Sequence, residues 1–251
     1  MDKDFNVVSR PFKKVYNYGV EDRCPVFDKT TLVTAYRKIN GFMACVTWHN
    51  GDILVSTTGS TDSDYVRMAK EMMLKHMKWE DWQIEVCGSQ GISLMFECVH
   101  PEDPHIIQEI PGMYFLGWRE NTWDSTVKGF GVNIANHWKD YAENVLNCYS
   151  AEAVVLPLDE LQTKVRYVKH EGFVVYTEDN QSFKIKSPYY LTSKWVARNP
   201  KTDKLVNLKN DIKQTIDEEY YHLIDLIREN IEQYTAMDEQ ARLSWVREQL
   251  A

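Results

Sequence analysis

The sequence lacks the signals of a membrane protein, a disulfide-stabilised protein and a zinc protein. Nowhere in its 251 residues is there a run approaching the roughly 18 to 20 uninterrupted apolar residues of a membrane-spanning helix, and the N-terminus has no apolar signal-peptide core. The five cysteines are odd in number and form no C-x-x-C pair, so neither a disulfide framework nor a zinc site is indicated. We therefore expect a cytoplasmic protein with reduced thiols, no membrane partner and no obligatory protein partner.

Positive charge is also scarce. The chain has 29 lysines and arginines against 37 acidic residues, a formal net charge of −8. Proteins that bind polyanions with their whole surface normally carry a basic footprint, so any nucleic-acid site here must be local. Basic residues cluster at 10–14, 37–38 and 184–186, whereas acidic residues concentrate in the C-terminal quarter. The ordinary proportion of hydrophobic residues, 43%, is enough for a sizeable core.

Short apolar runs separated by turn residues predict antiparallel sheet. The dipeptides Asn40-Gly41 and Asn50-Gly51 each separate two such runs, and both positions of an Asn-Gly pair tolerate positive φ, which is a strong hairpin signal. The strands are expected at residues 32–36, 42–48, 53–56, 92–99, 113–118, 172–177 and 182–186.

Helical spacing of apolar residues appears in four segments, residues 64–79, 134–147, 212–234 and 237–250. The methionine stripe of the first is expected to be core rather than a ligand surface. Residues 199–203 are the expected linker. The predicted fold class is α+β: residues 1–195 form a domain of antiparallel sheets flanked by helices, and residues 200–251 form a small all-helical C-terminal domain.

Lys38, in the motif K-x-N-G, is a candidate nucleophile. A lysine attacks phosphorus only as the neutral amine, and its ordinary pKa is about 10.4, so cationic neighbours or a metal must lower that pKa. Taken alone, the motif is more typical of an exposed turn lysine than of a nucleophile, because lysines are among the most exposed residues.

Two further segments are candidates for the same chemistry. Glu97 is an acid within an apolar strand, where a buried carboxylate needs a cation or a metal; on the other face of that strand it would simply meet water. Lys184 and Lys186 project to one side of a strand, with about 7 Å between them, which suits a polyphosphate. Lysines at a sheet edge also protect against aggregation, and that alternative remains open.

Seven motifs in order along the chain resemble those of covalent nucleotidyltransferases and, more narrowly, those of the phage-type RNA ligase 1 family. The resemblance covers about residues 9–191. The motifs are Ser9-Arg10-Pro11-Phe12, the K-x-N-G of Lys38, Thr58-Gly59-Ser60, Phe96-Glu97, Trp118-Arg119-Glu120-Asn121, Glu171-Gly172-Phe173-Val174 and Phe183-Lys184-Ile185-Lys186.

The resemblance implies an ATP-dependent RNA ligase with a nucleotidyltransferase (adenylation) domain. Lys38 takes AMP from ATP, AMP passes to the 5′-phosphate of an RNA strand, and a 3′-hydroxyl then displaces AMP. The RNA partner therefore carries 5′-phosphate and 3′-hydroxyl ends. Repair of RNA such as nicked tRNA, and a phage protein acting in the host cytoplasm, are implied as well. The helical C-terminus favours RNA, because DNA ligases and capping enzymes append a β-barrel there.

The same resemblance assigns roles to individual residues. Lys184 and Lys186 are catalytic together with Lys38 and hold the α-phosphate. Glu171 and Glu97 hold Mg²⁺ or Mn²⁺ through its water shell. The residues expected to bind ATP are Arg10, Arg37, Lys38, Gly41, Glu97, Glu171, Val174, Lys184 and Lys186.

The chain departs from the family pattern at Thr58, where relatives commonly place a basic residue, and at Phe42, which replaces a small hydroxyl residue. Two alternatives follow. One is a binding protein that kept the fold and lost ligation, and the other is an enzyme that adenylylates a different acceptor.

Overall fold

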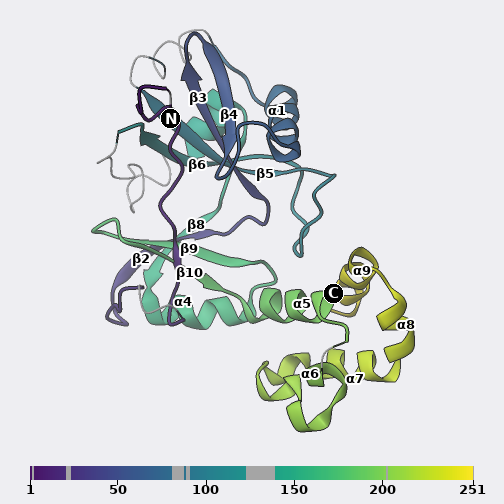
Figure 1. Ribbon diagram of the computed structural model, residues 1–251. Helices are drawn as coiled ribbons and strands as arrows, with labels where there is room; N and C mark the ends of the chain where they lie inside the picture. Colours follow the sequence, from purple (N-terminus) through teal and green to yellow (C-terminus); the bar gives the residue numbers. More distant parts are fainter. Residues whose placement is uncertain are drawn as a thin grey trace.

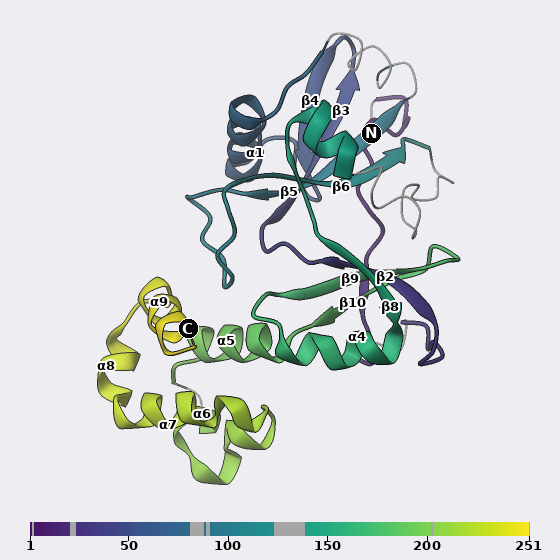
Figure 2. The same cartoon turned by 180° about the vertical axis from the view of Figure 1, so that it is seen from behind.

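The computed structural model describes residues 1, 3–20, 24–80, 88, 91–122, 139–201 and 203–250. Within them two five-stranded sheets lie one above the other, with a group of helices at one side of the lower sheet (Figures 1 and 2). The lower sheet has the order β1 (Tyr16–Asn17), β10 (Ser182–Lys186), β9 (Gly172–Thr177), β2 (Leu32–Arg37) and β8 (Ala153–Pro157). The upper sheet has the order β4 (Asp52–Thr57), β3 (Phe42–His49), β5 (Ile92–Val99), β6 (Gly112–Glu120) and β7 (Tyr149–Ser150).

Both sheets are largely antiparallel, which confirms the predicted α+β class. The strands at residues 92–99, 172–177 and 182–186 agree to the residue with the prediction, and the other expected strands are each one to three residues longer. The parallel pairs are β1 with β10 and β6 with β7, among the described residues. The short strand β8 was not expected from the sequence, although its run of apolar residues is typical of a strand.

The two Asn-Gly pairs have different structural roles. Asn50 and Gly51 have φ values of 54° and 81° and join the paired strands β3 and β4, so this hairpin is confirmed. The hairpin predicted at Asn40-Gly41 is wrong, because β2 and β3 belong to different sheets and this segment crosses between them. Gly41 is needed for close approach instead: a Cβ there would lie 2.3 Å from the carbonyl oxygen of Cys98.

Helix α1 (Asp64–His76) covers one face of the upper sheet (Figure 2). It begins at Ser63, whose hydroxyl accepts a hydrogen bond from the Val66 N–H, as expected of an N-cap. Its methionines and the residues spaced with them are buried against the sheet, so the prediction that the stripe is core is confirmed. The buried members are Val66, Met68, Ala69, Met72 and Met73, followed by Met77.

The lower sheet packs on α4 (Leu158–Lys164), which continues into the 3₁₀ turn η2 (Val165–Tyr167). The next helix, α5 (Pro188–Arg198), follows β10 directly and lies in a row with α4 below the sheet (Figure 1). Its N-cap is Ser187, whose hydroxyl accepts from the Tyr190 N–H, and Pro188 occupies the first turn. The sequence analysis missed both α4 and α5.

The C-terminal residues form short helices around their own apolar cluster. The expected helical segment 212–234 is divided among two 3₁₀ turns and two helices, and Asp211 caps the first of these turns with its side chain. Residues 134–138 of another expected helix lie outside the described residues, and η1 (Tyr141–Leu146) occupies the rest of that segment. The C-terminal elements are α6 (Asp203–Val206), η3 (Leu208–Asn210), η4 (Ile212–Gln214), η5 (Glu218–Tyr220), α7 (Tyr221–Glu229), α8 (Ile231–Ala236) and α9 (Glu239–Leu250).

Helix α5 joins the sheets to these C-terminal helices. Trp195 and Val196 near its end pack into the C-terminal apolar cluster, whereas Tyr190 and Ala197 pack with Ile106 and Ile107 of the β5–β6 connection. The boundary at residues 195–200 stays a prediction. Across the described residues, every helix is too short or too polar to traverse a lipid bilayer.

Gly172→Ala should destabilise the protein strongly. Gly172 has φ +129°, and a Cβ at this position would lie 2.0 Å from the carbonyl oxygen of Ile185 in the neighbouring strand. We expect the free energy of unfolding to fall by about 2–4 kcal/mol, measured by denaturant titration. Gly59→Ala is the matched control, because that glycine has no heavy atom within 4 Å of the added methyl group. Equal stabilities of the two variants would contradict the packing described for β9 and β10.

Candidate active site

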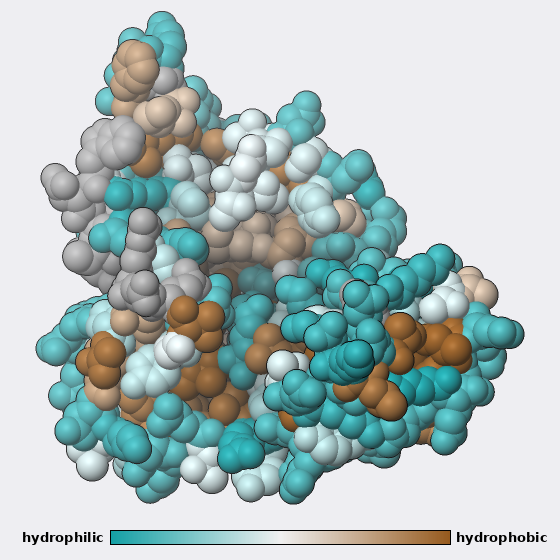
Figure 3. Space-filling view, turned by 60° about the horizontal axis from the view of Figure 1, so that its bottom comes forward, coloured by the Kyte–Doolittle hydropathy of each residue, from teal (hydrophilic) through white to brown (hydrophobic). Residues whose placement is uncertain are grey.

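A cavity of about 460 Å³ lies between the two sheets. Both sheets contribute its walls, and the molecular surface is hollowed between its upper and lower parts (Figure 3). Five residues expected at an ATP site line it: Arg37 and Lys38 at the end of β2, Glu97 in β5, Val174 in β9 and Lys184 in β10. The structure therefore brings together residues that are up to 147 positions apart (184 − 37).

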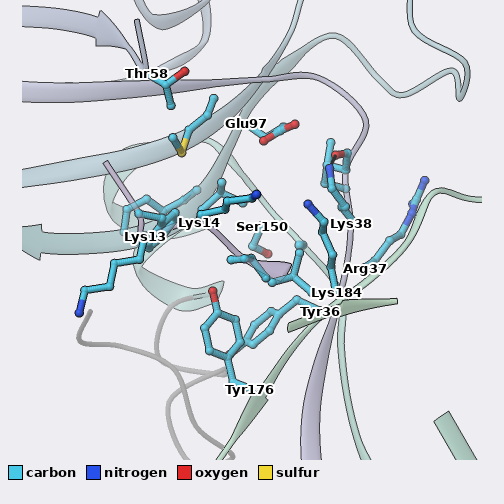
Figure 4. A pocket seen from close by; sticks show the side chains of 18 of the residues that line it. Lys13, Lys14, Tyr36, Arg37, Lys38, Thr58, Glu97, Ser150, Tyr176 and Lys184 are labelled. Atoms are coloured by element: carbon cyan, nitrogen blue, oxygen red, sulfur yellow. Dashed lines mark hydrogen bonds between the residues drawn. The ribbon is translucent and has the colours of Figure 1, made fainter. Parts of the chain in front are cut away.

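Lys38 lines this cavity and is held in place by its backbone and its side chain. Its N–H donates to the Gly172 carbonyl at 2.9 Å, so the residue that follows β2 is fixed against β9. Its Nζ donates to Glu171 Oε2 at 3.0 Å. In the close view the side chains of Lys38 and Lys184 and the carboxylate of Glu97 converge (Figure 4).

Glu171 is a buried carboxylate, 2% exposed, with three partners. Its Oε2 accepts from Lys38 and, at 2.6 Å, from Asn40 Nδ2; its Oε1 lies 3.3 Å from Lys186 Nζ. Burial by itself raises the pKa of this carboxyl, but the two ammonium groups outweigh burial and lower it. Glu171 is therefore ionised.

The expectation that cationic neighbours lower the pKa of Lys38 is wrong for the protein alone. Burial does lower that pKa, but the charges of Glu97 and Glu171, together with the hydrogen bond to Glu171, outweigh burial and raise it. Of the two lysines that were expected to act on Lys38, Lys186 pairs with Glu171 and Lys184 lines the cavity. Lys38 is consequently protonated until another charge enters the site.

Glu97 lines the cavity instead of facing open water. Its Oε1 accepts from the Gly41 N–H at 3.2 Å, so the glycine that permits close approach of the chain also orients this acid. Burial raises the pKa of Glu97, and Lys38 and the Gly41 N–H oppose that effect. Two carboxylates of opposite pKa shift thus face one lysine.

Lys184 and Lys186 have different surroundings although they are two residues apart on one strand. Lys184 pairs in register with Val174 and lines the cavity, whereas Lys186 pairs in register with Gly172 and makes the ion pair to Glu171. Lys186 Nζ also lies 4.8 Å from the ring centroid of Tyr190.

The two arginines predicted to bind ATP, Arg10 and Arg37, make no ion pair with Glu97 or Glu171 among the described residues. Arg10 does not line the cavity; its N–H donates to Ser93 Oγ at 3.1 Å at the start of β5. Arg37 lines the cavity, yet its Nη2 is 2.6 Å from Oε2 of Glu109, a carboxylate whose side chain is 3% exposed. The phosphate contact of Arg10 stays a prediction.

Sequence reasoning missed several residues of this site. Lys14 and Tyr176 line the cavity, and the amine of Lys14 points into it, whereas that of Lys13 points away (Figure 4). The basic cluster at residues 10–14 was the available signal. Thr58, where the family pattern has a basic residue, lines the same cavity.

Asn40 belongs to the K-x-N-G motif, but the sequence predicted no role for its side chain. It is buried and bridges the two sheets: its Nδ2 donates to Glu171, and its Oδ1 accepts from the Ile107 N–H at 3.0 Å. The connection that carries Ile107 also carries Glu109, the partner of Arg37. Both contacts span more than 60 positions of sequence, which local patterns do not report.

A second group of possible metal ligands, Glu71, His100 and Glu102, lies away from the cavity, with its ligand atoms within 4.8 Å of one another. His100 Nδ1 accepts from the Glu102 N–H at 3.1 Å, which places the proton of a neutral ring on Nε2, facing Glu71. Arg67 pairs with Glu102 at 2.6 Å and with Glu71 at 3.6 Å. This group is an ion-pair cluster, because its histidine presents a hydrogen-bond donor where a metal needs a lone pair.

The fold is similar to that of solved nucleic-acid ligases. An archaeal ATP-dependent RNA ligase, in its form 2, superposes with a TM-score of 0.54 at 14% identity, covering 94% of this chain and 63% of that one. Form 1 of an archaeal ATP-dependent RNA ligase gives a TM-score of 0.53 at 14% identity, covering 94% of this chain and 63% of that one. A putative ATP-dependent DNA ligase from Aquifex aeolicus gives 0.51 at 13% identity, with 94% and 64% covered.

These likenesses establish the fold. The chain spans a little under two thirds of the length of the ligases that it matches. No protein-family model and no curated protein sequence matches this chain.

Asn40→Ala should disturb the site more than its size suggests. The change leaves the buried Ile107 N–H without its acceptor and removes a donor from Glu171. We expect the free energy of unfolding to fall by about 1–3 kcal/mol, because a buried polar group that loses its partner carries the full desolvation cost.

Asn144→Ala is the control, since that asparagine is exposed and donates to Asp140 within one helix. Denaturant titration of both variants measures the difference. A change for Asn40→Ala no larger than that of the control would show that the bridge between the sheets is not needed.

Proposed function

We propose that this protein is an ATP-dependent RNA ligase that joins 5′-phosphate and 3′-hydroxyl ends through a lysyl-AMP intermediate and a 5′-adenylylated RNA. One observation carries the proposal: Lys38 lines the cavity with its amine 3.0 Å from Glu171, and Glu97 and Lys184 line the same cavity. The fold likeness to ATP-dependent ligases supports it. The preference for RNA, its repair role and a phage origin rest on the motif resemblance.

In the first step the Lys38 amine attacks the α-phosphorus of ATP. A P–N bond forms, the bond to the bridging oxygen breaks, and pyrophosphate leaves. The amine first loses a proton to solvent, because the neighbouring carboxylate Glu171, 3.0 Å away, has a lowered pKa and stays ionised. Lys184 and Lys14 supply positive charge along the cavity, where phosphate oxygens gain charge in the transition state.

A divalent cation, Mg²⁺ or Mn²⁺, fits beside Glu97. This carboxylate lines the cavity, and its Oε1 accepts from the Gly41 N–H, so the group has further coordinating capacity. Glu171 fits less well as a direct ligand, because both of its oxygens already face ammonium groups. When bound, the cation would offset the negative charge that keeps Lys38 protonated and would hold phosphate oxygens.

The two later steps are further displacements at phosphorus. A 5′-phosphate oxygen of RNA attacks the lysyl-AMP, the P–N bond breaks and Lys38 regains a proton, which leaves AMP joined to the RNA through a pyrophosphate bond. A 3′-hydroxyl then attacks the RNA phosphorus of that bond, loses its proton, and AMP leaves. Positioning supplies much of the catalysis in such in-line reactions.

Replacing Lys38 should abolish adduct formation. Incubation with ATP labelled in the α-phosphate and Mg²⁺ should give a covalent protein-AMP band for the wild type. Lys38→Arg keeps a positive charge beside Glu171, but its guanidinium stays protonated and cannot attack. We expect a loss of at least about a hundredfold, and the same for Lys38→Ala.

The matched control is Lys70→Ala, an exposed lysine of α1, which should form the adduct normally. A stable adduct in both Lys38 variants would overturn the assignment of the nucleophile.

A synthetic 5′-adenylylated RNA separates the later step from the first. Lys38→Ala should still seal this strand to a 3′-hydroxyl end without ATP, because the amine attacks only in the first step. Joining of a 5′-phosphorylated strand with ATP should be lost. Gel analysis of both reactions, repeated with DNA strands, measures this. If the wild type forms the adduct but seals no strand, the result favours a different acceptor. If it forms no adduct and seals no strand, the result favours a binding protein.

A further inference from the structure

The end of β10 and the helix α5 that follows it carry an excess of positive charge next to Lys38 and Glu171. The ammonium groups of Lys186 and Lys194 lie 4.8 Å and 5.7 Å from the ring centroid of Tyr190. Tyr190 is buried, 5% exposed, and fixes the positions of both amines relative to the helix. Tyr190 and Lys194 are four residues apart and lie on one face of α5, and Lys186, the last residue of β10, lies over the same ring and pairs with Glu171.

Lys194 is the cation of this group whose charge is not balanced. Lys186 pairs with Glu171, and Arg198, one turn further on, pairs with Glu239 at 2.9 Å. Among the described residues, Lys194 has no carboxylate within 4.0 Å of its amine. Burial lowers the pKa of Lys194, and repulsion from Lys186 and Arg198 lowers it further. An anion bound here would relieve that repulsion.

The position of Lys194 identifies the source of the anion. Lys186, Tyr190 and Lys194 do not line the 460 Å³ cavity, which has Lys14 and Lys184 for the phosphates of a nucleotide. Yet Lys194 is close enough to Lys38 and Glu171 for their charges to affect it. It lies one helical turn, about 5.4 Å, beyond Tyr190. A phosphate at Lys194 therefore belongs to a second substrate whose end reaches Lys38 from outside the cavity.

We propose that Lys194, supported by Lys186 and Tyr190, binds a backbone phosphate of the RNA strand whose 5′ end is brought to Lys38. This inference rests on the proposed function. An acidic protein, with a net charge of −8, needs such local cations to hold a polyanion. The 5′-phosphate would meet the Lys38 cluster, and a following phosphate of the same strand would meet α5.

Direct binding tests the site. The affinity for a 5′-phosphorylated RNA oligomer is measured by fluorescence anisotropy at several salt concentrations for the wild type, Lys194→Ala, Lys194→Arg and the control Lys70→Ala. Lys194→Ala should bind roughly three- to tenfold more weakly, and the slope of log affinity against log salt should fall by about one. Lys194→Arg should restore binding, because it keeps the charge. Unchanged affinity and slope in Lys194→Ala would overturn the proposal.

Kinetics distinguish RNA from ATP as the source of the phosphate. In sealing of a 5′-adenylylated strand, Lys194→Ala should raise the KM for RNA more than it lowers kcat, and adduct formation with ATP should fall by less than RNA binding. A loss confined to adduct formation would assign the phosphate to ATP and overturn the proposal. If the wild type forms no adduct, the proposed function fails, but the binding comparison still decides whether Lys194 holds RNA.

Discussion

The buried charge of Glu171 is the constraint on which the site depends. A carboxylate that is 2% exposed is costly unless cations and donors surround it. Its partners come from three places: Lys38 after β2, Lys186 at the end of β10, and Asn40 on the crossing between the sheets. Satisfying one charge thereby fixes Lys38, a second cation and the path of the chain from the lower sheet to the upper one.

The same cluster is connected to the C-terminal helices. Arg247 of α9 donates to the carbonyl oxygens of His105 and, at 3.0 Å, Ile106, and the next residue, Ile107, donates to Asn40. Ile106 and Ile107 also pack with Tyr190 of α5. The C-terminal helices therefore buttress the β5–β6 connection, and through Asn40 they reach Glu171.

Local patterns predicted the elements that local physics controls. The methionine helix and the strands at 92–99, 172–177 and 182–186 follow from periodicity, and the ordered motifs identified Lys38 and Glu97, which line one cavity. The hairpin prediction at Asn40-Gly41 was wrong because a tight turn and a close approach of two backbone segments favour the same dipeptide. The roles of Asn40 and Glu109 depend on partners more than 60 residues away, and the raised pKa of Lys38 depends on the balance of two carboxylates against burial.

The charge pattern around Lys38 gives the site an order of events. Before substrates arrive, the positive charge of Lys38 is matched by Glu171 and Glu97, and the paired state is favoured because every buried charge has a partner. In the proposed reaction, a nucleotide would bring negative charge to Lys14 and Lys184, and a cation held by Glu97 would offset one of the two carboxylate charges that keep Lys38 protonated. Lys38 would then release its proton to solvent, while Glu171 stays ionised and remains fixed by Asn40 and Lys186. In the proposed mechanism, the raised pKa of Lys38 in the protein alone ties formation of the neutral amine to the presence of the nucleotide and the cation.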